Sequence, residues 1–300
     1  MPIVQMLLAA LIVSGLLLMA GWFRSATHGS TAQGRPNAVD LLIGFVTNFF
    51  DTLGIGSFAT TTTAFRLLQR VPDELIPGTL LVGHALPVIA QAMIFITVVE
   101  VNPAQMAILI ACCVAGGWVG AGAVATFSRR AVQFAMAVAL SAAAVLMVNG
   151  MLGLIPAGGT ATTFPPQAFA IAVVVSAVLG ALLTIGIGNY APSLIIFSLL
   201  GVDPHAAFPI MMGSGAFVAT IAGVRFVSRG RFDRRAALGL AIGGIPGVLL
   251  AAWVVQSLPL DTLRWVVVAV VSYSAISLLR TAVIAPVTAA IPSAPPSPRR

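Results

Sequence analysis

Charged residues are scarce in this chain: only 8% of its 300 residues are Asp, Glu, Lys or Arg. Soluble domains carry about 25% charged residues, so an ordinary soluble protein is excluded. Hydrophobic residues make up 59% of the chain, its mean hydropathy is +1.06, and apolar runs near the roughly 20 residues that cross a bilayer recur along it. Because backbone groups in lipid must be paired within the chain, we predict an all-α, polytopic membrane protein surrounded by the lipid bilayer.

Lysine is absent, and the 15 basic residues are all arginine, against 8 acidic residues. The resulting net charge of +7 could indicate a nucleic-acid partner. The arginines, however, lie between apolar runs and do not cluster on a polar domain. Cytoplasmic loops of membrane proteins carry excess arginine, so the sequence predicts no nucleic-acid partner.

Patterns typical of enzymes and metal sites are also lacking. The two cysteines, Cys112 and Cys113, are adjacent in an apolar run, which excludes a disulfide framework and metal-ligand spacing. The chain has no nucleotide-binding loop, HExxH motif or GxSxG motif. The sequence therefore predicts no enzyme, no metal and no cofactor, and disfavours an ATP-driven pump acting alone.

Nine apolar segments, separated by short polar stretches, organise the chain. The first lies within residues 1–24 and has no basic residue before it, so we interpret it as an extra transmembrane span and not a signal peptide. We expect one repeat over residues 38–155, a second over residues 167–285, and a disordered cytoplasmic tail, rich in Pro, Ser and Ala, over residues 286–300. The apolar segments are Ile3–Phe23, Val39–Phe65, Leu75–Val99, Ala104–Phe127, Ala131–Leu154, Gln167–Leu200, His205–Val227, Ala236–Gln256 and Leu263–Ala285.

The two halves match each other without a gap at a constant offset of 132 residues. The first half contains DTLGIGSFATTTTAF and the second LTIGIGNYAPSLIIF, so each has a Gly-x-Gly break inside an apolar segment. Chance similarity of apolar stretches would not keep both glycine pairs and both proline pairs in register, so we infer an internal duplication. The matched pairs are Gly54 with Gly186, Gly56 with Gly188, Pro72 with Pro204, and Pro77 with Pro209.

The arginines favour one topology. If every segment crosses the membrane once, ten arginines face one side and five the other. If both Gly-broken segments are re-entrant elements or hairpins, fourteen share one side and only Arg264 is opposite, as the positive-inside rule expects. Each half then has one broken segment and three spans. This odd number of crossings predicts two inverted-topology repeats, with the N-terminus outside and the C-terminus inside.

The two breaks are the predicted substrate site. Glycine lets a chain leave helical geometry, and half-helices that begin at a break present free N–H groups and the positive end of a dipole to an anion. Matching breaks are expected to meet near the membrane midplane, although the hydroxyl groups could instead serve helix packing. The predicted substrate-binding residues are Gly54, Gly56, Ser57, Thr60, Thr61, Gly186, Gly188, Asn189 and Tyr190.

Two titratable residues are candidates for coupling. Asp51 lies three positions before Gly54 in an apolar segment, where a carboxylate is costly and must face a cavity or a partner. It could carry a proton, coordinate a cation, or cap a half-helix. His84 could titrate near neutral pH, or serve as a packing residue.

The paired Gly-x-Gly segments, each followed by a proline-containing loop and a Gly/Ser-containing span (GTLLVGHALP and IMMGSGAFVATIAG), resemble the TauE/SafE sulfite-exporter family over about residues 38–285. The resemblance implies a multispan permease of the plasma (inner) membrane for sulfite, an organosulfonate or a related small anion. Carried over by position, the implied substrate region is Gly54, Gly56, Ser57, Gly186, Gly188 and Asn189. The first half departs from the family pattern in lacking an early proline, whereas the second keeps Pro192.

We therefore predict a secondary transporter of a small anion that works by alternating access at paired broken helices. A passive channel for a small solute and a non-transporting membrane accessory protein are the alternatives. Homo-oligomer formation stays open.

Overall fold

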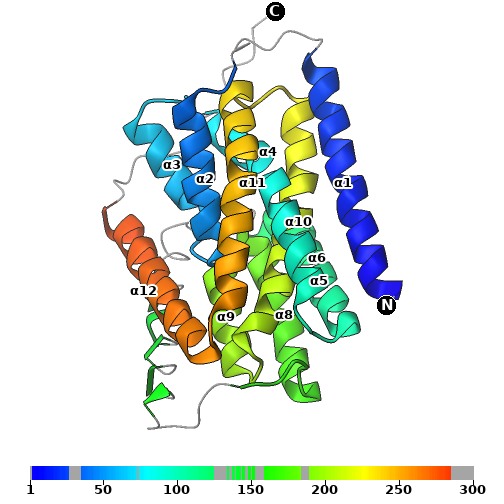
Figure 1. Cartoon of the computed structure of the whole chain (residues 1–300), viewed down its shortest axis with the longest axis vertical. Helices are drawn as coiled ribbons and strands as arrows, with labels where there is room; N and C mark the ends of the chain where they lie inside the picture. The colour runs from blue at the N-terminus through cyan, green and yellow to red at the C-terminus, as the bar shows by residue number, and fades with distance from the viewer. Residues whose placement is uncertain are drawn as a thin grey trace, which may run out of the picture.

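The structure, a computed structural model, describes residues 2–26, 35–72, 74–124, 159–183 and 189–284, with separate positions between 134 and 152. The described residues form a bundle of helices (Figure 1), apart from one isolated bridge between Ala161 and Val202. Predicted site residues Gly186 and Gly188 and the tail 286–300 lie outside the described residues. The helices are α1 (Pro2–Ala26), α2 (Ala38–Thr52), α3 (Ser57–Leu67), α4 (Ile76–Gly83), α5 (Ala85–Val98), α6 (Pro103–Val124), α8 (Pro166–Leu183), α9 (Tyr190–Leu199), α10 (Pro204–Ser228), α11 (Arg234–Ser257) and α12 (Leu260–Ile284).

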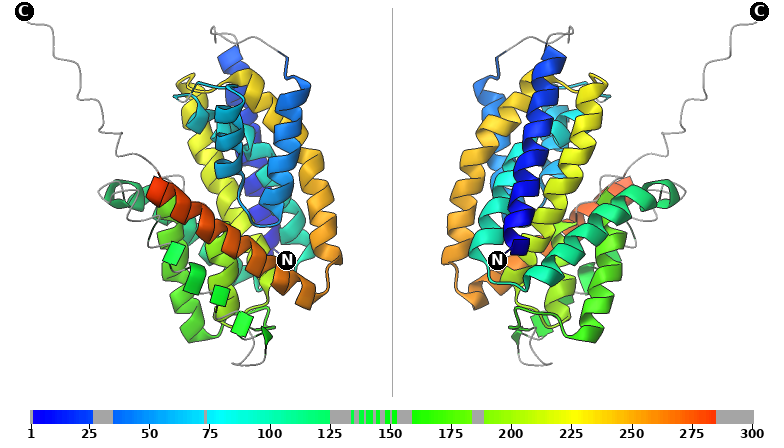
Figure 2. Two further views of the ribbon diagram at one scale, coloured as in Figure 1. Left: turned by 90° about the vertical axis from the view of Figure 1, so that its left-hand side faces the viewer. Right: turned by 90° about the vertical axis from the view of Figure 1, so that its right-hand side faces the viewer.

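Within the described residues, five helical stretches are long and apolar enough to cross a membrane. This agrees with the prediction of an all-helical, multi-pass membrane protein. The two side views of Figure 2 show α1 lying along α10, and α1 also contacts α5. The five stretches are Pro2–Trp22, Ile76–Val98, Pro166–Leu183, Pro204–Ser228 and Arg234–Ser257.

The chain changes direction between α2 and α3. The N–H of Ile55 donates to the Phe50 carbonyl and that of Gly54 to the Asp51 carbonyl, which is the pattern of a Schellman motif. Gly54 has φ +98° there, a conformation that side chains with a Cβ rarely adopt. The sequence signal for this break is therefore the glycine that ends α2.

The ends of α3 and α9 carry the same set of hydrogen bonds, 132 residues apart. After α3, residues 68, 69 and 70 donate to the carbonyls of 64, 66 and 65; after α9, residues 200, 201 and 202 donate to those of 196, 198 and 197. The central residues, Gln69 and Gly201, both have positive φ, at 48° and 91°. The offset found in the sequence thus recurs in backbone geometry.

Two helix pairs approach closely through glycine. A Cβ added at Gly243 or Gly247 of α11 would overlap the backbone of α2, and one added at Gly116 of α6 or Gly180 of α8 would overlap the backbone of the partner helix. Small residues allow such close contact in membrane bundles, where packing and not water drives association. Each pair, α2 with α11 and α6 with α8, joins one half of the chain to the other.

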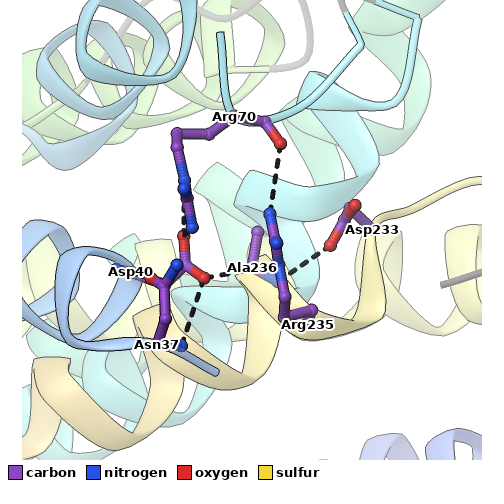
Figure 3. A network of polar contacts seen from close by, with 6 residues as sticks. All are labelled: Asn37, Asp40, Arg70, Asp233, Arg235 and Ala236. Atoms are coloured by element: carbon purple, nitrogen blue, oxygen red, sulfur yellow. Dashed lines mark hydrogen bonds and ion pairs between the residues drawn. The ribbon is translucent and has the colours of Figure 1, made fainter. Parts of the chain in front are cut away.

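One end of the bundle is held by a buried aspartate. Asp40, at the start of α2, contacts Arg70 (Nη2 to Oδ1, 2.9 Å) and Arg235 (Nε to Oδ2, 3.4 Å), as Figure 3 shows. Arg70 follows α3 and Arg235 begins α11, and nearby the Asp233 N–H donates to the Thr79 hydroxyl at 2.8 Å. The start of α2 and the end of α3 therefore lie at the same end of the molecule.

The equivalent segments of the second half meet at the other end. Gln105, near the start of α6, pairs with the backbone of Phe164 before α8, and Ala161 bridges to Val202 after α9. Helix α10 leads from the turn after α9 to the loop at Asp233, and its 25 residues span about 37 Å. The α2–α3 pair therefore starts and finishes at one end of the bundle, and the α8–α9 pair starts and finishes at the other end.

Candidate functional site

A cavity of about 140 Å³ lies where the starts of α3 and α9 meet. The last turn of α2 and parts of α4, α5, α8, α10 and α12 also line it. A polar cavity needs only about 10–15 Å³ to hold one water molecule, so several waters or one small ion fit. Its polar lining residues among the described ones are Asp51, Ser57, Thr60, Asn189, Tyr190, Tyr273, Ser274 and Ser277.

The start of α3 is capped by a side chain from the last turn of α2. Gly56 is the N-cap residue, with φ +88° and no side chain to offer. Instead, the N–H of Ser57 donates to Asp51 Oδ1 at 2.6 Å. Of the three interpretations of Asp51, the capping contact is thus present, and the same carboxylate also lines the cavity.

Among the described residues, no side chain caps the start of α9. Asn189 is the N-cap residue, but its side chain makes no capping hydrogen bond. It is 2% exposed, lines the cavity, and its Oδ1 atom has no hydrogen-bond partner among the described residues. The first N–H groups of a helix also lack partners within it. A buried polar atom without a partner is costly, so this end of the cavity is suited to a ligand.

The comparisons with known proteins concern this half of the molecule. A family model described as "Sulfite exporter TauE/SafE" matches residues 168–299. The second half of the chain matches TauE/SafE. No curated protein and no solved structure was found to match the chain. TauE/SafE is a family of membrane transporters and not of enzymes, and the matched range contains Asn189 and Tyr190.

Gln91 links the TauE/SafE half to the first half, and the sequence analysis did not single it out. Its Nε2 donates to Asp51 Oδ2 at 3.0 Å and to the Thr52 hydroxyl at 2.8 Å, and its Oε1 accepts from the Tyr190 hydroxyl at 3.3 Å. Gln91 is fully buried in α5. The available signal was a polar residue inside an apolar membrane segment, which usually marks function.

His84 and Thr61 form a separate network. The Thr61 hydroxyl lies 3.0 Å from His84 Nε2, and His84 Nδ1 lies 3.1 Å from Asn48 Oδ1. Because Asn48 Oδ1 only accepts, Nδ1 carries the proton, and the Thr61 hydroxyl donates to Nε2. All three side chains are buried, and neither His84 nor Thr61 is among the described residues that line the cavity.

The remaining predicted residues divide between the cavity and its support. Gly56, Ser57 and Thr60 line the cavity, and the Thr60 hydroxyl donates to carbonyls of its own helix start. Gly54 is buried outside the lining, and a Cβ there would lie 2.6 Å from Leu194 Cδ1. Its part is therefore to let α2 end close to α9.

Proposed function

We propose that this chain is a secondary transporter of a small anion in the plasma (inner) membrane, and that the anion is sulfite, an organosulfonate or a related sulfur oxyanion. The observation that carries the proposal is the cavity between two helix starts, one from each half of the chain. No arginine is among the described residues that line it. Helix starts and hydroxyl groups can hold an anion weakly enough to release it, which transport requires.

The arrangement of the halves supports alternating access. The shared hydrogen-bond pattern after α3 and α9, the entry of the two helix pairs from opposite ends, and the helix pairs that join the halves are what an inverted repeat would produce. In such a transporter, one half rocks against the other about a central site. The Asp40 ion pairs would then hold the cytoplasmic end of the first repeat to α11.

Uptake by vesicles tests the proposal. Purified protein in proteoliposomes should take up sulfite, methanesulfonate or a related sulfonate, and internal unlabelled anion should accelerate the uptake. Uptake without such acceleration would indicate a passive channel, and no uptake of any of these anions or of sulfate would contradict the proposal.

A glycine substitution tests whether transport depends on the cavity. Gly56→Leu should abolish uptake, because its side chain would fill the cavity at the start of α3. Gly201→Leu is the matched control: its φ of +91° is close to the +88° of Gly56, and neither glycine has an atom within 4 Å of an added Cβ. Both substitutions place a Cβ on a backbone with positive φ, which residues other than glycine rarely adopt, so retained uptake in Gly56→Leu would place the site elsewhere.

A further inference from the structure

Gln91 touches groups that belong to different halves of the proposed anion site. Its amide nitrogen contacts Asp51, which caps α3, and its amide oxygen contacts Tyr190, the first residue of α9. We propose that Gln91 is a positioning residue that links protonation of Asp51 to anion binding at Tyr190. This inference rests on the proposed function.

The present orientation of the Gln91 amide is fixed by chemistry. The Thr52 hydroxyl donates to the Asn48 carbonyl at 2.8 Å, so toward Gln91 it can only accept. An ionised Asp51 also only accepts. Both neighbours therefore require Nε2, which leaves Oε1 to receive the Tyr190 proton.

Protonation of Asp51 reverses every bond in this chain. Asp51 Oδ1 keeps the N–H of Ser57, so a proton arriving from the cavity binds Oδ2, which then donates toward Gln91. The Gln91 amide turns over to accept through Oε1, and the Thr52 hydroxyl can turn its proton from the Asn48 carbonyl to the same oxygen. Nε2 then donates to the Tyr190 oxygen, and the Tyr190 hydroxyl turns its own O–H bond toward the cavity.

The Tyr190 hydroxyl, which then no longer donates to Gln91, can donate to an anion in the cavity. Tyr190 lines the cavity next to Asn189, and its present bond to Gln91 is long for an O–H donor at 3.3 Å. The same proton removes the negative charge of Asp51 from the cavity wall. One proton thus neutralises a repelling group and supplies a donor, so the anion and the proton should bind together.

Other titratable groups do not substitute for Asp51. The helices packed against α2 are α3, α5 and α11; their charged residues are Arg66 in the last turn of α3 and Arg234 and Arg235 at the start of α11. His84, between α4 and α5, bonds to Asn48 and Thr61. Tyr190 and Tyr273 are the remaining titratable groups that line the cavity among the described residues.

Binding of methanesulfonate and of sulfite to purified protein, measured by calorimetry across pH, tests the link. Methanesulfonate stays a monoanion throughout, and the ionisation of sulfite is the same for every variant, so differences between variants report the protein. Wild-type affinity should fall by about tenfold per pH unit once Asp51 ionises, as expected for one coupled proton. Asp51→Asn should vary by less than about twofold over the same range, whereas Gln91→Met should show a shallower slope than the wild type, because only the charge of Asp51 then acts on the anion.

Two further variants separate the link from a structural role. Gln105→Met makes the same chemical change at an amide outside the cavity lining, which pairs with the backbone of Phe164. This variant should keep the wild-type slope. Tyr190→Phe keeps the ring and removes only the hydroxyl, so its slope should flatten even if Gln91→Met does not fold. A wild-type slope in Gln91→Met or in Tyr190→Phe, or pH-independent binding by the wild type, would overturn the link alone. A wild type that binds neither anion would overturn the proposed function as well.

Discussion

The starts of α3 and α9 face one cavity but differ in how they are capped. Asp51 supplies a carboxylate to the first N–H of α3, whereas Leu183 stands at the matching position before α9 and lines the cavity without a charge. The α9 start instead has Asn189, whose Oδ1 has no partner in the described part of the chain. The two halves of the chain thus differ where they meet. The α3 start already has a negative partner, whereas the groups that can donate to an anion at the α9 start are its first N–H groups and Asn189 Nδ2.

Giving the α9 start a carboxylate of its own should have the largest effect. Leu183→Asp adds a second negative charge to the cavity wall, and anion affinity should fall by roughly a hundredfold when that group is ionised, since like charges a few ångströms apart repel strongly. Affinity should recover as the pH is lowered. Leu183→Asn has the same shape without the charge and is the control in vesicle uptake assays. Equal affinities for both variants would show that the anion binds elsewhere.

Removing the unpartnered amide should have a smaller effect. Asn189→Leu preserves bulk and deletes the polar group at the α9 start, so affinity should fall by about tenfold or more, the cost of one hydrogen bond to a charged partner. Asn149→Leu changes an asparagine whose described hydrogen bond runs to the Val145 carbonyl, four residues earlier, and it should bind like the wild type. An unchanged affinity in Asn189→Leu would remove the distinction between the two helix starts.

Much of this comparison was accessible from the sequence, because its signals are local. Gly54 and Gly56 marked the interruption between α2 and α3, and the polar residues after each break, Ser57 and Asn189, line the cavity. The offset between the halves likewise reappears in the turns after α3 and α9.

The contacts that join distant segments were not accessible. Gln91 is 40 residues from Asp51 and 99 from Tyr190, and one glutamine in an apolar run has no spacing that identifies its partners. Thr61 and Thr60 are neighbours in the sequence, but successive residues of a helix point in different directions. Thr60 therefore lines the cavity, and Thr61 bonds to His84. Such a division depends on how helices pack, which the sequence pattern does not specify.

The His84 network should matter least for binding. Thr61→Val removes the donor to His84 Nε2 and leaves a buried acceptor without a partner, which should lower the free energy of unfolding by about 1–3 kcal/mol. Anion affinity should stay within about twofold of the wild type, since Thr61 is not among the lining residues described. Thermal unfolding and calorimetric binding on the same samples measure both, and Thr61→Ser, which keeps the hydroxyl, is the control. A loss of affinity without a loss of stability would bring His84 into the site.

The location of the bound anion tests the central claim most directly. Selenite is a heavier analogue of sulfite, and its selenium can be located by anomalous diffraction from crystals soaked with it. Anion binding at the start of α9 predicts a selenium peak inside the cavity, with oxygens about 3 Å from the first N–H groups of α9 and from the Asn189 side chain. A peak outside the cavity, with the cavity itself free of selenium, would contradict it.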